Sequence, residues 1–234
     1  MGQELFPKQR LWTSLSLSAG RWQTWALVFV YFTAFGGFIA LTAWLPRFWT
    51  SFFSLSVRTA GILTLAYSTL ASLARVAGGR ISDGLGGERT GVAALAVMAA
   101  GAVSVTVSRD AWFSLAGVLV MALGMGAANA AVFKMVPQKV PWAVGGAAGW
   151  VGGIGAFGGF VFPNALSLFL GRGIPVAVTG ATAAAWTAAA GEPAVAFRSG
   201  DPGYAAGFSV FIALAVLSAA AVVILGKLAD AERK

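Results

Sequence analysis

Six runs of roughly 20 mostly apolar residues constrain this 234-residue chain more than any other feature. They cover residues 24–45, 60–82, 91–108, 111–137, 144–170 and 204–226. A helix of that length crosses the hydrocarbon core of a bilayer, where only helices and closed barrels satisfy their own backbone groups. Because the runs are unbroken rather than alternating over about ten residues, they predict helices. With 58% hydrophobic and 10% charged residues, the chain is predicted to be an all-α, polytopic membrane protein.

The connections between the runs are predicted to be short, with one exception. We expect Pro46 to end the first helix, since proline breaks helix interiors, and residues 83–89 to form a charged, glycine-rich loop. Residues 109–110 are expected to form a tight turn, and residues 137–141 to divide the fourth helix from the fifth. The long connection, 171–203, has an apolar middle bounded by Pro and Gly. This pattern favours an interfacial or re-entrant piece over a seventh span.

The composition excludes several classes of function. The chain has no Cys and no His, which excludes a disulfide framework and thiolate chemistry and removes the commonest zinc ligand and general base. We therefore predict no enzyme activity, no metal site and no cofactor. The net charge is +8, but the cations are scattered singly and no basic run alternates with aromatic residues. This distribution argues against nucleic acid as a partner. No removable signal peptide is expected at the N-terminus.

The scattered cations instead predict the topology. With six spans, both termini lie on one side of the bilayer, and that side holds Lys8, Arg10, Arg21, Arg80, Arg89, Lys134, Lys139, Lys227, Arg233 and Lys234. The other side holds Arg47, Arg58, Arg109, Arg172 and Arg198. The excess of Lys and Arg on the first side predicts that the termini are cytoplasmic and that the protein is in the cell membrane. We expect a cytoplasmic segment 1–23, a six-helix bundle over 24–228 and a cytoplasmic tail 229–234, with the connection 171–203 on the non-cytoplasmic side.

The remaining cation, Arg75, lies inside the second run. An arginine near the centre of a spanning helix costs on the order of 2.5 to 3.5 kcal/mol. Ser68, Ser72 and Gly79 recur with it at helical spacing and share its face, which favours an interior position. The alternative is that Arg75 extends along the helix to the headgroups.

The six runs contain no acidic residue that could neutralise Arg75. A buried charge must be paired or hydrated, and the flat guanidinium fork suits planar oxyanions. A small anion is therefore the predicted partner of Arg75.

Two other runs carry candidate binding residues. Residues 145–159 contain eight glycines, among them Gly149, Gly152, Gly153 and Gly155. Glycine ridges let helix backbones touch, and bare backbone in a membrane is also tolerated where it lines a cavity or ligand. Both readings stay open.

In the first run, Tyr31 and Phe35 share a face with Phe38 beside them. They would offer a hydroxyl donor and a flat wall, or else contact only core and lipid. Asn129 in the fourth run is a weaker candidate, because an asparagine there more often makes an interhelical hydrogen bond.

Four motifs together resemble a known family. The segment GGRISDGLGGER, which ends at Arg89, is similar to the cytoplasmic turn signature of the major facilitator superfamily. More narrowly, YFTAFGGFIALTAWLP, LARVAGGRISDGLGG, NAAVFKMVP and AGWVGGIGAFGGFVFP resemble the nitrate/nitrite porters of that superfamily, in order, across roughly residues 24–165. The resemblance is to the C-terminal six-helix half, and it implies one half of a major facilitator fold.

The resemblance also implies a function, which is transport of nitrate or nitrite by alternating access. It makes Arg75 the anion-binding arginine of the half, with Tyr31 and Phe35 as the aromatic contacts and Gly149–Gly159 as the second nitrate signature. By analogy alone, Arg80, Asp83 and Arg89 would be gating residues whose charge pairs break and reform.

The N-terminal half, with its partner arginine and first nitrate signature, has no counterpart in the sequence. A separately encoded N-terminal half is therefore the predicted partner, alongside the anion and the lipid bilayer. The alternatives are a half-porter for another anion, an inactive or scaffold subunit from a truncated gene, and a homodimer, in which two like-charged Arg75 side chains would face each other.

Overall fold

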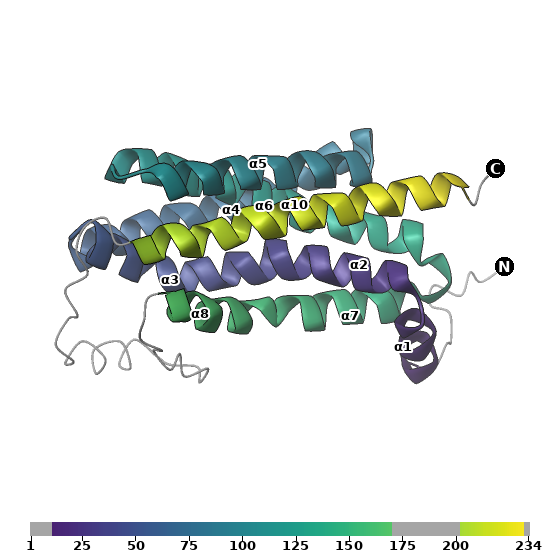
Figure 1. Cartoon of the computed structure of the whole chain (residues 1–234). Helices are drawn as coiled ribbons and strands as arrows, with labels where there is room; N and C mark the ends of the chain where they lie inside the picture. The colour runs from purple at the N-terminus through teal and green to yellow at the C-terminus, as the bar shows by residue number, and fades with distance from the viewer. Residues whose placement is uncertain (1–10, 170–201, 232–234) are drawn as a thin grey trace.

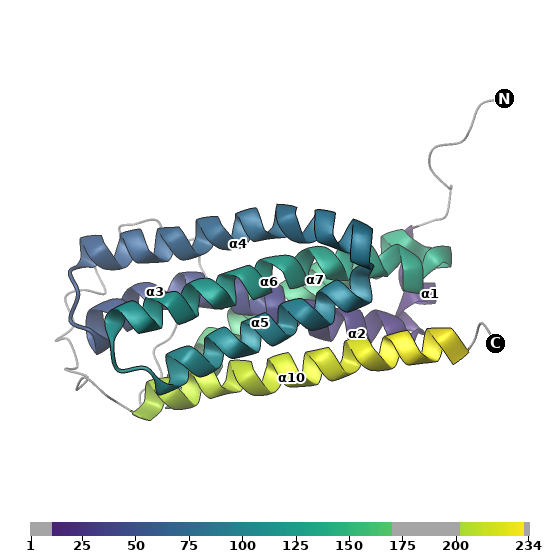
Figure 2. The ribbon, with the colours of Figure 1, turned by 90° about the horizontal axis from the view of Figure 1, so that it is seen from above.

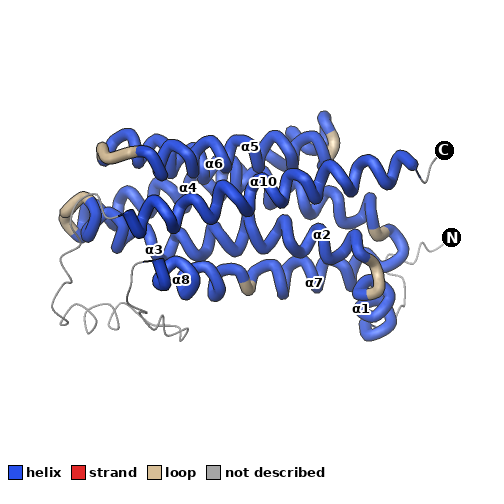
Figure 3. The backbone as a smooth tube through the Cα atoms, viewed as in Figure 1, coloured by secondary structure: helices blue, strands red, loops and turns tan. Residues whose placement is uncertain are grey.

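The computed structural model describes residues 11–169 and 202–231. Within these ranges the chain is helical and contains no strand, and the loops between helices are short (Figure 3). The elements are α1 (Leu11–Ala19), α2 (Trp22–Tyr31), the π-helical turn η1 (Phe32–Gly36), α3 (Gly37–Phe52), α4 (Val57–Leu85), α5 (Gly87–Val107), α6 (Ala111–Lys139), the 3-10 turn η2 (Pro141–Ala143), α7 (Val144–Ala156), α8 (Gly158–Phe169) and α10 (Pro202–Ala231).

Six helical segments of the described chain are long and apolar enough to cross a membrane. They are Trp22–Phe52, Val57–Leu85, Gly87–Val107, Ala111–Lys139, Pro141–Ala165 and Tyr204–Leu228. The first joins α2, η1 and α3, and the fifth joins η2, α7 and α8. The predicted all-α fold with six transmembrane helices is confirmed.

The six spans run side by side, and α1 and the end of α10 lie at the same end of the bundle (Figure 1). The helix α6 packs between α4 and α5, and α5 also packs against α10. The first span lies against α6, α10 and α7, and its second part, α3, contacts α4 and α8 (Figure 2). The first span is therefore central, with α4 on one side of it and α7 on another.

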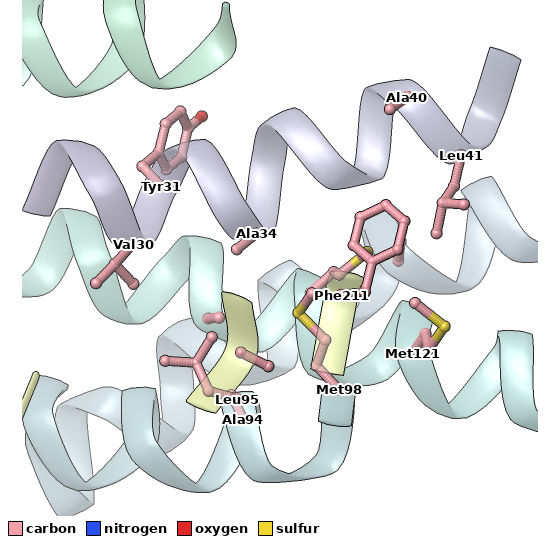
Figure 4. Packing of buried hydrophobic residues seen from close by; sticks show 14 of the residues in the cluster. Val30, Tyr31, Ala34, Ala40, Leu41, Ala94, Leu95, Met98, Met121 and Phe211 are labelled. Atoms are coloured by element: carbon pink, nitrogen blue, oxygen red, sulfur yellow. The ribbon is translucent and has the colours of Figure 1, made fainter. Parts of the chain in front are cut away.

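Small residues bring α4, α5 and α6 into backbone contact. A Cβ atom added to Gly124 of α6 would lie 2.4 Å from the backbone nitrogen of Met98 in α5, and one added to Gly78 of α4 would lie 2.6 Å from Cα of Ala127 in α6. Glycine is the residue that permits such approaches. Apolar side chains such as Leu95, Met98 and Phe211 fill the space between α5, α10 and the first span (Figure 4).

Proline does not end the first helix at Pro46, contrary to the prediction. The helix continues to Phe52, although an interior proline removes one backbone hydrogen bond. Beyond the proline, Phe48, Trp49 and Phe52 are buried in the core. Their packing holds the last turns in helical form. The helix α6 likewise continues through Pro137 to Lys139, whose side chain pairs with Glu88 and donates to the carbonyl oxygen of Leu225.

The predicted charged loop at residues 83–89 is reduced to one residue. The helix α4 extends to Leu85 and α5 begins at Gly87. Gly86 between them has φ +87°, a conformation that glycine adopts without steric cost. The expected cytoplasmic segment 1–23 contains a further helix, α1. The expected connection 171–203 lies outside the described residues, except that α10 begins at Pro202.

Candidate anion-binding site

The guanidinium of Arg75 turns toward the first span. Its Cζ atom lies 5.1 Å from the ring centroid of Phe35 and 5.9 Å from that of Phe38. Both distances are within the range of cation–π attraction. The side chain thus reaches the aromatic residues of η1 and α3 and does not extend toward the end of α4, which lies ten residues and about 15 Å away at 1.5 Å per residue. Within the described chain, the guanidinium therefore packs against the first span of the bundle.

Arg75 has no ionic partner among the described residues. No carboxylate of that part of the chain lies within ion-pair distance of it, and its Nε atom is buried without a hydrogen-bond acceptor. A buried donor without an acceptor costs free energy, which contact with the two rings offsets only in part. Arg75 is therefore a cation with unused donors at the level of the aromatic residues.

The aromatic residues beside Arg75 form a row. Tyr31 stacks on Phe35 at a centroid distance of 4.9 Å and an angle of 23°. Phe35 stacks on Phe38 at 6.1 Å, and Phe38 on Tyr67 at 5.8 Å. The π-helical turn η1 separates Tyr31 from Gly37. Turns of this type are frequent at functional sites, and here the turn lies between Tyr31 and Gly37, with Phe35 inside it.

Tyr31 is buried, and only 6% of its surface is exposed. In Figure 4 its ring lies on a different side of the first span from Val30 and Ala34. A Cβ atom on Gly155 of α7 would lie 2.6 Å from Cδ1 of Tyr31. Only glycine allows α7 to come this close. Gly155 therefore positions the tyrosine ring.

The other predicted glycines of α7 lie apart from this contact. An added Cβ atom at Gly152 or Gly153 would meet nothing within 4 Å, and one at Gly149 would meet only Leu15 of α1, at 3.6 Å. Gly149 is six residues, about 9 Å, from Gly155. The structure thus brings Arg75, Tyr31, Phe35 and Gly155 together. Gly152 and Gly153 face open space, and Gly149 lies toward α1.

Two residues of the site were not predicted. Phe133 of α6 presents an edge to Tyr31 at 5.1 Å and 80°, and its side chain is exposed. Tyr67 of α4 ends the row and donates from its hydroxyl to Sδ of Met125 at 3.2 Å. Tyr67 is two turns before Arg75 on α4, so the helical spacing carried this signal. Asn129 is buried, and its Oδ1 atom has no hydrogen-bond partner within the described ranges.

Of the three predicted gating residues, Asp83 forms an ion pair within the described chain. Asp83 accepts a hydrogen bond from Lys134 of α6 at 2.5 Å. Glu88, at the start of α5, pairs with Lys139, which also donates to the carbonyl oxygen of Leu225 in α10 at 3.2 Å. Arg80 and Arg89 make no ion pair with any residue that the structure describes.

Both lysines were predicted only as topology markers. Their place at the end of α6, on the same side as the α4–α5 turn, was the available signal for the two pairs. The site as a whole holds a cation with free donors beside stacked rings, one of which packs on Gly155, and this arrangement suits binding of a small planar anion.

Comparisons with known proteins agree with this architecture. Residues 2–163 match the family model described as the Major Facilitator Superfamily. A probable nitrate/nitrite antiporter of Thermus thermophilus is 34% identical over 161 residues, which is 60% of this chain and 36% of the relative. A probable nitrate/nitrite transporter of Mycobacterium tuberculosis is 33% identical over 143 residues, and the nitrite extrusion protein of Bacillus subtilis is 33% identical over 143 residues. In both cases the match covers 36% of the relative.

The fold has a counterpart of known structure. A bacterial homologue of the human lysosomal transporter Spinster, crystallised in an inward-facing and unoccupied conformation, superposes with a TM-score of 0.57. The match covers 96% of this chain and 50% of the other, at 15% identity. The chain therefore has the fold of one half of that transporter.

Proposed function

This chain belongs to the major facilitator superfamily, and we propose that it is the C-terminal six-helix half of a transporter for nitrate or nitrite. The observation that carries the proposal is the Arg75 guanidinium, which lies over Phe35 and Phe38 without an ionic partner in the described chain. Relatives named as nitrate or nitrite transporters support the choice of anion. The chain matches 36% of their length, so the activity of the whole transporter is part of the proposal.

Each residue of the cluster has a role in binding the anion. Arg75 donates two parallel hydrogen bonds to two oxygens of nitrate, a geometry that the planar fork favours. The Tyr31 hydroxyl donates to an oxygen, and Phe35 provides a flat wall. Gly155 holds the Tyr31 ring in place through its close contact with that ring. Gly152 and Gly153 leave open space for the anion or the opposing half, and Gly149 extends this glycine face toward α1.

A second six-helix half completes the transporter. Alternating access requires two bundles that move around a central site. Of the six spans, α4 and the span Pro141–Ala165 are the least buried, with 28% of each apolar window inside the fold. These spans carry Arg75 and the open glycines, so we assign their exposed faces to contact with an N-terminal half. A homodimer would instead bring two Arg75 charges together.

We further propose that the termini are cytoplasmic and that the protein is in the cell membrane. The bundle comprises residues 24–228, between the cytoplasmic segments 1–23 and 229–234. At the cytoplasmic end, the Asp83–Lys134 pair joins α4 to α6, close to Arg80 and Arg89. We assign this group to gating, with Arg80 and Arg89 available to pair with the other half when the site opens to the opposite side.

The test is nitrate uptake into vesicles that contain this chain together with an N-terminal half, either encoded beside it or taken from the Thermus relative. Arg75→Lys keeps the charge but loses the fork. We expect uptake to fall by about 30-fold, as for the loss of a strong charge-assisted hydrogen bond. Arg58→Lys, at the exposed start of the same helix, is the matched control and should transport normally.

Unchanged uptake by the Arg75→Lys variant would refute the role of Arg75 in binding. If the protein is folded in the membrane but transports neither nitrate nor nitrite with either of the two N-terminal halves, it would be a scaffold subunit. Uptake of a different anion, without uptake of nitrate or nitrite, would identify a half-porter for that anion.

A further inference from the structure

A cavity lies at the end of the bundle away from α1. Its volume is about 250 Å³, and it is bounded by the end of α3, the turn between α5 and α6, and the start of α10. Phe48, Phe52 and Phe208 supply apolar walls, and Ser108 and Arg109 supply polar ones. Protein interiors rarely leave voids larger than one water molecule, whose share of liquid volume is about 30 Å³. The cavity therefore has room for part of a ligand.

This cavity is separate from the anion-binding site. Phe48 faces α10, with its ring centroid 5.4 Å from that of Tyr204 and 5.2 Å from that of Phe208. Phe38, earlier in α3, instead stacks on Tyr67 of α4. The two sites thus use different faces of the first span. The cavity lies among α3, α5 and α10, at the left end of the bundle in Figure 1.

Exposed residues around the cavity mark the edge of the bilayer. Trp112, three residues after Arg109, is 77% exposed, and Phe113 beside it is also exposed. Exposed tryptophan at the start of a spanning helix is typical of the headgroup level. Val107, which lines the cavity, is exposed on the apolar side of this boundary. The cavity therefore extends from the headgroup level into the hydrocarbon, which suits an amphiphile.

The charge at the mouth of the cavity is not neutralised by its neighbours. Arg109 is exposed and makes no ion pair with any described residue. The carboxylate of the adjacent Asp110 accepts a hydrogen bond from the backbone N–H of Phe113 at 2.8 Å and caps α6. Ser108 donates to the carbonyl oxygen of Asp110 at 2.9 Å. The guanidinium is thus available for a phosphate, which it binds through two parallel hydrogen bonds.

We propose that this cavity binds an anionic phospholipid of the surrounding leaflet. Arg109 holds the phosphate group, and Phe48, Phe52 and Phe208 surround the first part of the acyl chains. The lipid would contact the aromatic residues through its acyl chains and Arg109 through its phosphate. These contacts would hold α3, α5 and α10 together at this end of the bundle. This site does not depend on nitrate transport, and it is tested separately.

The test is native mass spectrometry of the full chain after delipidation and titration with phosphatidylglycerol or with phosphatidylcholine, which has no net charge. We expect phosphatidylglycerol to be retained preferentially. Arg109→Gln should weaken its binding about tenfold, as for the loss of one charge-assisted pair. Arg58→Gln removes an exposed arginine at the same end of the bundle and should change nothing. Ala205→Phe fills the cavity from the α10 wall while Arg109 remains, and it should also reduce binding.

Equal retention of the two lipids would overturn the proposal. So would undiminished phosphatidylglycerol binding by Arg109→Gln, or by Ala205→Phe if the spectrum of the variant is that of a folded protein. Inorganic phosphate that binds in an Arg109-dependent way without phosphatidylglycerol binding would assign the guanidinium to a free anion instead. A thermal-shift measurement with and without the lipid checks folding of each variant.

Discussion

The two sides of the bundle use glycine in opposite ways. Between α5 and α6, a Cβ atom on Gly101 would lie 2.6 Å from the carbonyl oxygen of Gly117, and one on Gly124 would lie 2.4 Å from a backbone nitrogen of α5. On α7, added Cβ atoms at Gly152 and Gly153 would meet nothing within 4 Å. The same residue type closes one interface and leaves another face unfilled.

This difference distinguishes an interface that is closed within the chain from a helix face that no part of the described chain covers. The close α5–α6 contact gains dispersion energy along two backbones, and it is a finished interface. The open face of α7 lacks such contacts. Its glycines therefore weaken the helix without gaining close packing in return. The aromatic row reaches α7 only at Gly155, through the Tyr31 ring. Under the proposed function, the open face of α7 is a surface for the ligand or for a second half of the transporter.

The largest expected effect comes from filling the closed interface. Gly124→Ala places a Cβ atom against the backbone of α5 and should destabilise the bundle by about 3 kcal/mol, the upper part of the usual range for overpacking. Gly152→Ala should instead stabilise the protein by about 0.5 kcal/mol, because alanine favours the helix. Reversible unfolding in detergent measures both. Equal effects would remove the distinction between the two sides.

The ion pairs give a smaller contrast. Lys139 is almost fully buried and Glu88 is partly exposed, so Lys139→Met should cost about 2 kcal/mol, less than for a fully buried pair. The Asp83–Lys134 pair is more exposed, and Lys134→Met should cost less than about 1 kcal/mol. The same unfolding assay compares the two. If Lys134→Met lowered the free energy of unfolding more than Lys139→Met, the exposed Asp83–Lys134 pair would stabilise the bundle more than the buried Lys139–Glu88 pair, contrary to this expectation.

The smallest contrast lies within α7. Gly155→Ala would displace the Tyr31 ring and should lower nitrate uptake about fivefold, whereas Gly153→Ala should leave the ring in place. Tyrosine fluorescence is obscured by the tryptophans of the chain, so uptake by the assembled halves is the measurement. Normal uptake by Gly155→Ala would show that the position of the Tyr31 ring is not required.

Hydropathy predicted the six spans because burial in lipid is a property of composition alone. The family resemblance, based on four motifs, is confirmed by the relatives that match. The predicted ends of helices were wrong where packing between helices outweighs the local conformational preference of a residue. Pro46 and Pro137 lie inside helices, and after Pro46 the buried side chains of Phe48, Trp49 and Phe52 hold the last turns. The single-residue turn at Gly86 depends on one left-handed backbone conformation, which composition does not specify.

The site was predicted in part for a similar reason. Helical spacing places Tyr31 and Phe35 on one face, and the family resemblance grouped Arg75 of another helix with them. The Lys134–Asp83 and Lys139–Glu88 pairs join residues 51 positions apart in each case. Such pairs depend on how α6 is rotated against the α4–α5 turn, which sequence spacing does not determine. The edge contact of Phe133 with Tyr31 has the same origin.

The most direct test of the central claim is the accessibility of the face that carries Arg75. The chain has no cysteine, so Ser72→Cys, on the exposed part of this face one turn before Arg75, provides a unique label site in the assembled transporter. We predict that a water-soluble thiol reagent modifies it and that nitrate slows the reaction, while Val97→Cys, on the exposed side of α5, stays unmodified. An unreactive cysteine at position 72, or one whose rate does not respond to nitrate, would contradict an anion site at Arg75.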